Sequence, residues 1–175
     1  MKLDLFEDLQ KGPFEKDFAL PFDLTETVIS GQKHAVSGPE GISVHGKYDG
    51  SRLSLTGACD LTVTWPCDRC LSDTDVSLSA EIDLDFPVSD GRISSDPEDP
   101  EPYLENGHVI DLARVLSEEI LLKRPEKVLC RPDCKGLCPV CGQNLNEGSC
   151  SCDKTVPDPR MAQIQDVFKK FKEVE

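Results

Sequence analysis

The spacing of the cysteines constrains this chain more than any other feature. Six of the nine fall within residues 130–152, at Cys130, Cys134, Cys138, Cys141, Cys150 and Cys152. The run Cys138-Pro139-Val140-Cys141-Gly142 is typical of a zinc knuckle, in which two thiolates separated by two residues reach one ion across a tight turn that the glycine permits. Structural zinc takes four such ligands in a tetrahedron. We therefore expect this segment to fold around metal.

Cys67 and Cys70 form a second pair with the same spacing. Trp65-Pro66-Cys67 is similar to a thioredoxin-type redox motif, but that motif needs a strand-to-helix step in a parallel sheet. This pair lies instead between two alternating apolar runs, at the expected tip of a hairpin. Metal binding is the favoured interpretation. Cys59 falls on the apolar face of its run and is expected to be a small buried hydrophobic residue.

Without Cys59, eight cysteines remain, enough for two Cys₄ sites. The preferred grouping joins Cys67 and Cys70 to Cys130 and Cys134, and leaves Cys138, Cys141, Cys150 and Cys152 as a local second site. The first site would connect the hairpin tip to the segment after the expected helix. One alternative stays open, a single zinc in the cluster with the remaining thiols free. Closed Cys₄ sites leave no position for water or substrate, which argues against metal catalysis.

Apolar residues alternate with polar ones over much of the first half of the chain. The runs contain Phe14, Phe18, Leu20, Phe22, Leu24; Ile42, Val44, Tyr48; Leu53, Leu55, Cys59, Leu61, Val63, Trp65; and Val76, Leu78, Ala80, Ile82, Leu84, Phe86, Val88. A period of two predicts strands buried on one face. The last two runs, separated by residues 67–74, predict a long antiparallel hairpin. We predict an α+β fold: an antiparallel sheet with this hairpin, one covering helix, and a C-terminal Cys-rich segment followed by a helix.

Two helices and one loop complete the prediction. Asp111 is a good N-cap for a helix with the stripe Leu112, Val115, Leu116 and Ile120, ended by Pro125. Residues 92–107, acidic and proline-rich, predict a mobile loop. Asp158-Pro159 begins a second helix, whose stripe contains Met161, Ile164, Val167, Phe168 and Phe171. The expected division is an acidic β-rich domain at 1–129 and a zinc module with its helix at 130–175, packed as one unit.

Charge narrows the choice of partner. The net charge is −14, and all of it lies in residues 1–129. An acidic body repels phosphates, so we expect a basic protein partner or charge that serves solubility alone. The local basic features are Arg131, Lys135 and Lys169-Lys170-Lys172, where any direct contact with RNA is expected.

Other classes of function find little support in the sequence. The first residues lack the apolar run of a secretory signal, and no stretch is long and apolar enough to span a membrane, so we expect a cytoplasmic protein. His34, His45 and His108 form no ligand-spaced pair. No phosphate-cradling glycine loop or nucleophile elbow is present. The sequence therefore predicts a protein that is not an enzyme and has no small-molecule substrate.

The motifs together resemble a known family. They are Cys67-Asp68-Arg69-Cys70-Leu71; Ile110-Asp111-Leu112 with Glu118-Glu119-Ile120-Leu121-Leu122; and the run from Cys134 to Asn146, followed by Cys150-Ser151-Cys152 and Asp158-Pro159-Arg160. In these the chain resembles the YceD-type family, the large ribosomal RNA subunit accumulation proteins, from about residue 14 onward. The resemblance implies a role in ribosome assembly or precursor processing. It also implies that the site of Cys67 and Cys70 is the common one, since some members lack the second cluster.

The leading hypothesis is a non-enzymatic factor that supports accumulation of large-subunit (23S) ribosomal RNA. One or two structural Zn²⁺ ions would fix its shape, and its partner would be a ribosomal protein, a pre-rRNA complex or an assembly factor. The alternative is a zinc–thiolate redox sensor or partner-binding protein, in which oxidation of the thiolates releases the metal. A nuclease acting on ribosomal RNA precursor is disfavoured, because the acidic cluster of residues 92–107 lies in the expected flexible loop, where a fixed geometry is not expected.

Overall fold

The computed structural model describes residues 1–94 and 100–152. By its internal contacts the chain divides into two units. Residues 1–67 and 72–130 form the first unit, and residues 68–71 together with the chain from Arg131 form the second. The predicted helix beginning at Asp158 lies outside the described residues.

The first unit is built mainly of antiparallel sheet, as expected. Its larger sheet has the order β2-β5-β6-β4-β3, and β7 pairs with β6 and with β8. The bounds are β2 (Phe14–Pro21), β3 (Glu26–Ile29), β4 (Gln32–Ser37), β5 (Gly41–Tyr48), β6 (Arg52–Pro66), β7 (Asp73–Ser89) and β8 (Arg92–Ile93). β6 and β7 are in register from Arg52↔Pro87 to Pro66↔Asp73.

One face of this sheet is apolar and the other is polar. Leu55 and Val63 of β6 are fully buried, and Leu55 lies opposite Leu84 of β7. Thr56, between the apolar positions, is exposed. Because side chains alternate across a strand, the odd positions of β6 and the even positions of β7 share the apolar face.

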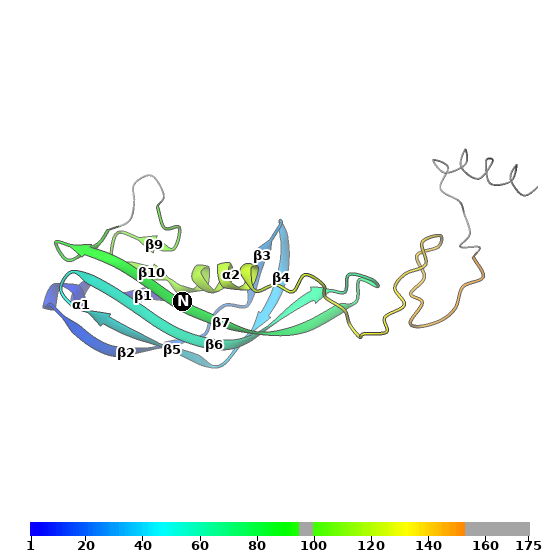
Figure 1. Cartoon of the computed structure of the whole chain (residues 1–175), viewed down its shortest axis with the longest axis horizontal. Helices are drawn as coiled ribbons and strands as arrows, with labels where there is room; N and C mark the ends of the chain where they lie inside the picture. The colour runs from blue at the N-terminus through cyan, green and yellow to red at the C-terminus, as the bar shows by residue number, and fades with distance from the viewer. Residues whose placement is uncertain (95–99, 153–175) are drawn as a thin grey trace, which may run out of the picture. The chain divides into compact units, whose positions relative to one another are not determined.

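Two helices and a small sheet complete the core on the apolar side. They are α1 (Phe6–Lys11), α2 (Leu112–Leu122) and a three-stranded sheet of β1 (Lys2–Asp4), β10 (Val109–Asp111) and β9 (Leu104–Glu105). α2 packs against β7 and β3 and buries Leu112, Val115, Leu116 and Ile120. Asp111 caps it, since its carboxylate accepts from the Ala113 N–H at 3.1 Å. Figure 1 shows α2 and the small sheet along one side of the large sheet.

The predicted loop over residues 92–107 differs from the structure at both ends. Residues 92–93 and 104–105 form strands β8 and β9. The cause is burial: Ile93 is only 4% exposed, and its N–H donates to the Gly107 carbonyl at 2.7 Å. Because few residues of this segment are apolar, its sequence pattern does not indicate that Ile93 is buried.

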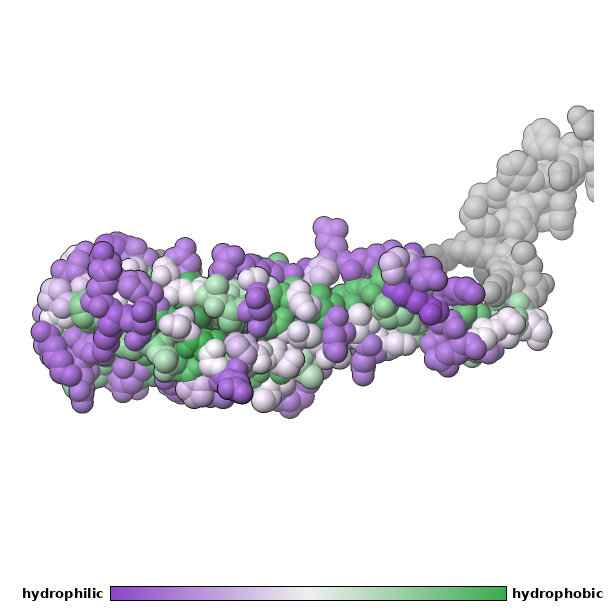
Figure 2. All heavy atoms as spheres, turned by 90° about the horizontal axis from the view of Figure 1, so that it is seen from below, coloured by the Kyte–Doolittle hydropathy of each residue, from purple (hydrophilic) through white to green (hydrophobic). Residues whose placement is uncertain are grey.

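The core leaves some apolar surface uncovered. Within residues 1–94 and 100–152, nine apolar residues pack against it while only partly buried, among them Phe14, Phe18 and Leu84. Figure 2 shows apolar surface between polar side chains along this unit. A chain that is 38% hydrophobic has a modest core, which makes other sources of rigidity valuable.

Candidate metal centres

The eight predicted ligand cysteines fall into two groups of four. The first group is Cys67, Cys70, Cys130 and Cys134, and the second is Cys138, Cys141, Cys150 and Cys152; within each, all sulfur atoms lie within 4.8 Å of one another. Thiolates about 2.3 Å from a tetrahedral zinc ion are separated by about 3.8 Å. All nine cysteines are free of disulfide bonds. Each group can therefore hold one metal ion, while the identity of the metal and its ligands stays a prediction.

The first group is mostly buried. Cys67, Cys70 and Cys134 are at most 5% exposed, and Cys130 is exposed. The Cys67 N–H donates to the Ser72 carbonyl at 2.8 Å, which closes the loop containing the first pair. Leu71 has a φ of +61°, a conformation that lets the chain return within a few residues. This tight loop explains how two thiols three positions apart come together.

Arg69 organises the second unit. Its guanidinium Nη1 donates to the Cys134 carbonyl at 2.7 Å, and its own carbonyl accepts from the Leu137 N–H at 3.0 Å. Gly136 has a φ of +75°, and a Cβ there would lie 2.9 Å from the Arg69 carbonyl oxygen. Only glycine combines that backbone conformation with so close an approach.

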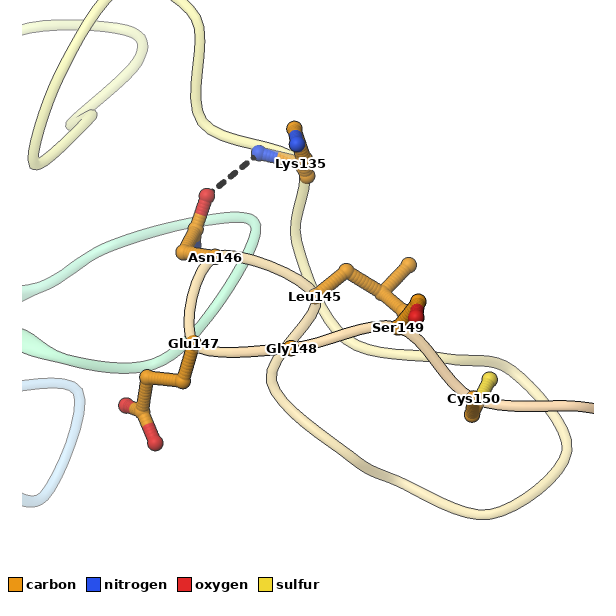
Figure 3. A pocket seen from close by; sticks show the side chains of 7 residues that line it. All are labelled: Lys135, Leu145, Asn146, Glu147, Gly148, Ser149 and Cys150. Carbon is orange, nitrogen blue, oxygen red and sulfur yellow. Dashed lines mark hydrogen bonds between the residues drawn. The ribbon is translucent and has the colours of Figure 1, made fainter.

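Asn146 supports the Cys134 sulfur. Its side-chain Nδ2 donates to Cys134 Sγ at 3.3 Å, and its Oδ1 accepts from the Lys135 N–H at 2.8 Å. Figure 3 shows the second of these bonds, with Asn146 on a loop that also includes Leu145 and Glu147. Hydrogen bonds to ligand atoms orient them and tune their charge. Asn146 is therefore an outer partner of the first cysteine group.

The second cysteine group is local and more exposed. The Gly142 N–H donates to the Cys138 carbonyl at 2.9 Å, and the Cys138 N–H donates to the Gln143 carbonyl at 2.8 Å. Gly142 has a φ of +73°, which closes this knuckle-type turn. Cys138 is buried, Cys141 is exposed, and Cys150 and Cys152 are half-buried.

The thiols of the second group are already polarised. The N–H groups of Cys141 and Val140 lower the pKa of Cys138 to about 6. A hydrogen bond to Cys141, burial and the charge on Cys141 raise the pKa of Cys152 to about 12. Backbone donors thus favour a thiolate at Cys138, while neighbouring sulfur disfavours a second negative charge at Cys152. A divalent cation among the four sulfurs would remove that conflict, because it stabilises every thiolate at once.

Four thiolates around one ion suit zinc and a structural role. Sulfur donors select soft or borderline metals, and a Cys₄ site leaves no open position for substrate. Within residues 1–94 and 100–152, no further group of three or more His, Cys, Asp or Glu side chains is placed to hold a metal. His34 belongs to neither group: it is buried, with its ring 6.2 Å from that of Trp65.

The remaining predicted residues are placed as follows. Cys59 is 9% exposed in β6, and burial raises the pKa of its thiol. Arg131 and Lys135 are exposed, and Arg131 lies 3.6 Å from Asp133. Lys169-Lys170-Lys172 lie outside the described residues. Arg69, Gly136 and Asn146 also contribute to the first cysteine group or its loop, and no sequence signal indicated their roles, although all three occur in the motifs that carry the family resemblance. Among the helices of the described residues, none has the length and apolar character that crossing a membrane requires.

Curated proteins from two mycobacteria and from maize are similar to this chain. A 28% identity over 114 residues relates it to uncharacterized proteins of Mycobacterium tuberculosis and Mycobacterium bovis, covering 65% of this chain and 55% of each relative. A chloroplastic protein of Zea mays, named large ribosomal RNA subunit accumulation protein YCED homolog 1, is 31% identical over 105 residues, which is 57% of this chain and 28% of the maize protein. The matched region thus spans about half the length of the mycobacterial relatives.

No solved structure matches the chain. The family model for the large ribosomal RNA subunit accumulation protein YceD matches residues 55–168, a region that includes most of β6, all of β7 and α2, and all eight grouped cysteines. The chain belongs to the YceD family of large ribosomal RNA subunit accumulation proteins.

Proposed function

We propose that this protein is a non-enzymatic factor that supports accumulation of large-subunit ribosomal RNA during ribosome biogenesis. The observation that carries the proposal is the family match over residues 55–168. The maize relative, whose name describes the same role, supports it. In this proposal both cysteine groups hold structural zinc, and the protein acts by binding a partner in the cytoplasm.

The chemistry of the cysteine groups supports a structural role for the metal. Four thiolates would complete the coordination of zinc and leave no site for an activated water. Arg69, Gly136 and Asn146 stabilise the loop around Cys134 through three contacts within one unit. These contacts are consistent with a module that acts through a fixed shape, since structural zinc contributes folding free energy directly.

The test is the ratio of large-subunit to small-subunit ribosomal RNA in cells depleted of this chain. We expect the ratio to fall, and to be restored by the wild-type protein but not by Cys67→Ser/Cys70→Ser. A Cys59→Ser protein, which changes a thiol outside both groups, is the control and should restore the ratio. An unchanged ratio on depletion would contradict the proposed role.

The partner is proposed to be a basic ribosomal protein, a pre-rRNA complex or an assembly factor. The net charge of −14 supports a basic protein over bare RNA. Affinity purification at low and high salt tests this, since attraction between exposed charges weakens as salt rises. Recovery of no ribosomal protein, RNA or assembly factor at either salt concentration would argue against it.

A second candidate function is redox sensing by the second cysteine group. Its favouring observation is exposure: Cys141 is exposed, and Cys150 and Cys152 are half-buried. Oxidation of accessible zinc thiolates releases the metal. Zinc release at micromolar peroxide, followed with a chromophoric chelator, is the expected result for a sensor, and retention of the metal would reject this candidate.

A further inference from the structure

Strand β7 has a long free edge. It pairs with β6 along residues 73–87, and its other partner among the described residues is β8, which reaches it at Val88 and Ser89 alone. A free edge presents unpaired N–H and C=O groups that can accept another strand. This edge lies entirely within the first unit.

Two hydrogen bonds identify the backbone groups that face this edge. Lys123 Nζ donates to the Ser79 carbonyl at 3.0 Å, and the Ser94 N–H donates to the Pro87 carbonyl at 2.8 Å. In an antiparallel strand the N–H and C=O of one residue point the same way, and the direction alternates along the chain. The odd-numbered residues of β7 therefore point away from β6. Pro87 fits this register, because the N–H that proline lacks would face outward.

The side chains along the edge are strongly acidic. The odd positions from 73 to 85 are all exposed and comprise Asp73, Asp75, Ser77, Ser79, Glu81, Asp83 and Asp85. Lys123 lies 3.1 Å from Glu81, and Arg52 lies 2.8 Å from Asp85. These two bases face five acids on the strand, so the edge retains a net negative charge.

A groove with an apolar part and a charged part runs beside the same edge. It lies between β7 and α2, and its apolar part is lined by Leu84, Tyr103, Val115 and Leu122. Its charged part is lined by Glu81, Asp83, Glu118, Glu119 and Lys123. Leu122 is 77% exposed. A strand added to β7 would project alternate side chains toward the polar face, beside the acids, and toward this groove.

We propose that the free edge of β7 binds an extended segment of a basic protein, in which Lys or Arg alternates with apolar residues. Backbone hydrogen bonds to Ser77, Glu81 and Asp83 would hold it, together with the Ser79 N–H, since the Ser79 carbonyl already accepts from Lys123. Its basic side chains would lie beside the acids, and its apolar side chains would cover Leu84 and Leu122. This inference rests on one part of the proposed function, namely that the partner is a basic protein of ribosome biogenesis.

Charge argues against two other occupants of the edge. A second copy of this chain, paired edge to edge, would bring the acids of one β7 against those of the other, and like charges facing each other are destabilising. RNA would bring phosphates to the same acids. A basic strand is the occupant whose charge complements the edge.

A designed peptide tests the mode of binding. The probe is an acetylated, amidated ten-residue peptide of alternating lysine and valine with a fluorophore. Its match is the same peptide N-methylated at every residue, which keeps the charge but loses the backbone N–H donors of both strand edges. By fluorescence anisotropy we expect the N-methylated peptide to bind at least about tenfold more weakly, since 1.4 kcal/mol corresponds to a factor of ten. Equal affinities would overturn the proposal, because charge alone would then explain binding.

Variants of the full-length protein locate the site. Asp83→Lys should weaken binding by at least about tenfold, whereas Glu40→Lys, the same change of charge at an exposed position after β4, should weaken it much less. Asp83→Pro removes an outward N–H and should also abolish binding. Far-UV circular dichroism and thermal unfolding verify that each variant folds. Equal weakening by Asp83→Lys and Glu40→Lys would contradict docking at this edge.

Hydrogen exchange gives a readout that does not depend on any variant. With the lysine–valine peptide bound, the amides of Ser77, Ser79, Glu81 and Asp83 should exchange more slowly. Protection confined to β2, at the opposite edge of the sheet, or found at no strand edge would overturn the proposal. Neither result depends on the ribosomal RNA ratio, which is measured separately in depleted cells. Failure of this inference is therefore distinguishable from failure of the proposed function.

Discussion

At the scale of single residues, two glycines with positive φ shape the second unit for different reasons. Gly142 has a φ of +73°, and among the described residues beyond its two chain neighbours no atom lies within 4 Å of the position a Cβ would take. Gly136 has a φ of +75°, and a Cβ there would lie 2.9 Å from the Arg69 carbonyl. Gly142 therefore meets a conformational requirement alone, whereas Gly136 also permits a close approach of two backbone segments.

This difference predicts unequal effects of alanine. Gly142→Ala should weaken the free energy of zinc binding by about 1–2 kcal/mol, which is the penalty of the left-handed conformation for a residue with a Cβ. Gly136→Ala should cost more, because the loop at Arg69 must also shift. The measurement is zinc affinity by competition with a chromophoric chelator. A larger loss for Gly142→Ala than for Gly136→Ala would contradict this assignment.

At the scale of elements, the N-terminus of α2 depends on one side chain. Asp111 accepts from the Ala113 N–H and satisfies a donor that the helix itself leaves unpaired. α2 contributes Leu112, Val115, Leu116 and Ile120 to the core. Loss of the cap therefore affects the packing of the first unit as well as the helix.

We expect Asp111→Ala to lower the free energy of unfolding by about 1 kcal/mol, within the range for N-caps. Asp111→Asn retains an accepting oxygen and should cost only a fraction of this. Urea denaturation of both variants provides the measurement. Equal destabilisation by alanine and asparagine would show that the hydrogen bond contributes little.

The turn between β5 and β6 gives a pH dependence of known sign. The Asp49 carboxylate accepts from the N–H groups of Arg52 and Ser51 at 2.8 and 2.7 Å, and these bonds lower its pKa below the ordinary 3.8. A carboxyl with a depressed pKa stabilises the fold above its unfolded-state pKa, and this stabilisation is lost as pH falls through the folded-state pKa. The contribution should therefore be complete near neutral pH and disappear in strong acid.

Asp49→Asn tests this, because the amide retains an acceptor without the titrating charge. The difference in unfolding free energy between wild type and variant should be constant above about pH 5 and shrink as pH falls toward about 2. Denaturation at a series of pH values gives the curve. If this difference did not change with pH, protonation of the Asp49 carboxylate would not be linked to folding stability.

Length and one-sided burial explain which elements the sequence could predict. The alternating residues 53–65 and 76–88 lie in β6 and β7, where an apolar and a solvated face produce a long period of two. β3, with four residues, has only Thr27 and Ile29 buried, and α1 buries only Leu9. Patterns so short are not distinguishable from chance, and β8 and β9 depend on distant partners.

The candidate site divides in the same way. The spacing of cysteines is local information, so sequence alone suggested the pairs Cys67/Cys70 and Cys138/Cys141. The roles of Arg69 and Asn146 depend on contacts across many positions, at separations of 65 residues from Arg69 to Cys134 and 12 from Asn146 to Cys134. Neither has a characteristic spacing that a sequence motif would reveal.

At the scale of the whole molecule, an acidic chain with a modest core contains two groups of four thiols. In the part of the chain that the structure describes, nine apolar residues are only partly buried against the core, and the net charge of −14 adds self-repulsion in the folded state. Metal binding to folded thiolates adds free energy that an apolar core of this size does not supply. The cysteine groups are therefore expected to contribute to stability as well as to local shape.

Metal analysis tests this account directly. Protein purified without chelator should contain two zinc ions per chain, and Cys67→Ser and Cys141→Ser should each reduce the content to about one, because each removes a ligand from a different group. The double variant should contain none, and Cys59→Ser, outside both groups, should retain two. Chelation should lower the thermal midpoint of the wild type and of Cys59→Ser alike. A single ion that is lost in Cys141→Ser but retained in Cys67→Ser would leave the first group as free thiols and confine the metal to the segment from Cys138 to Cys152.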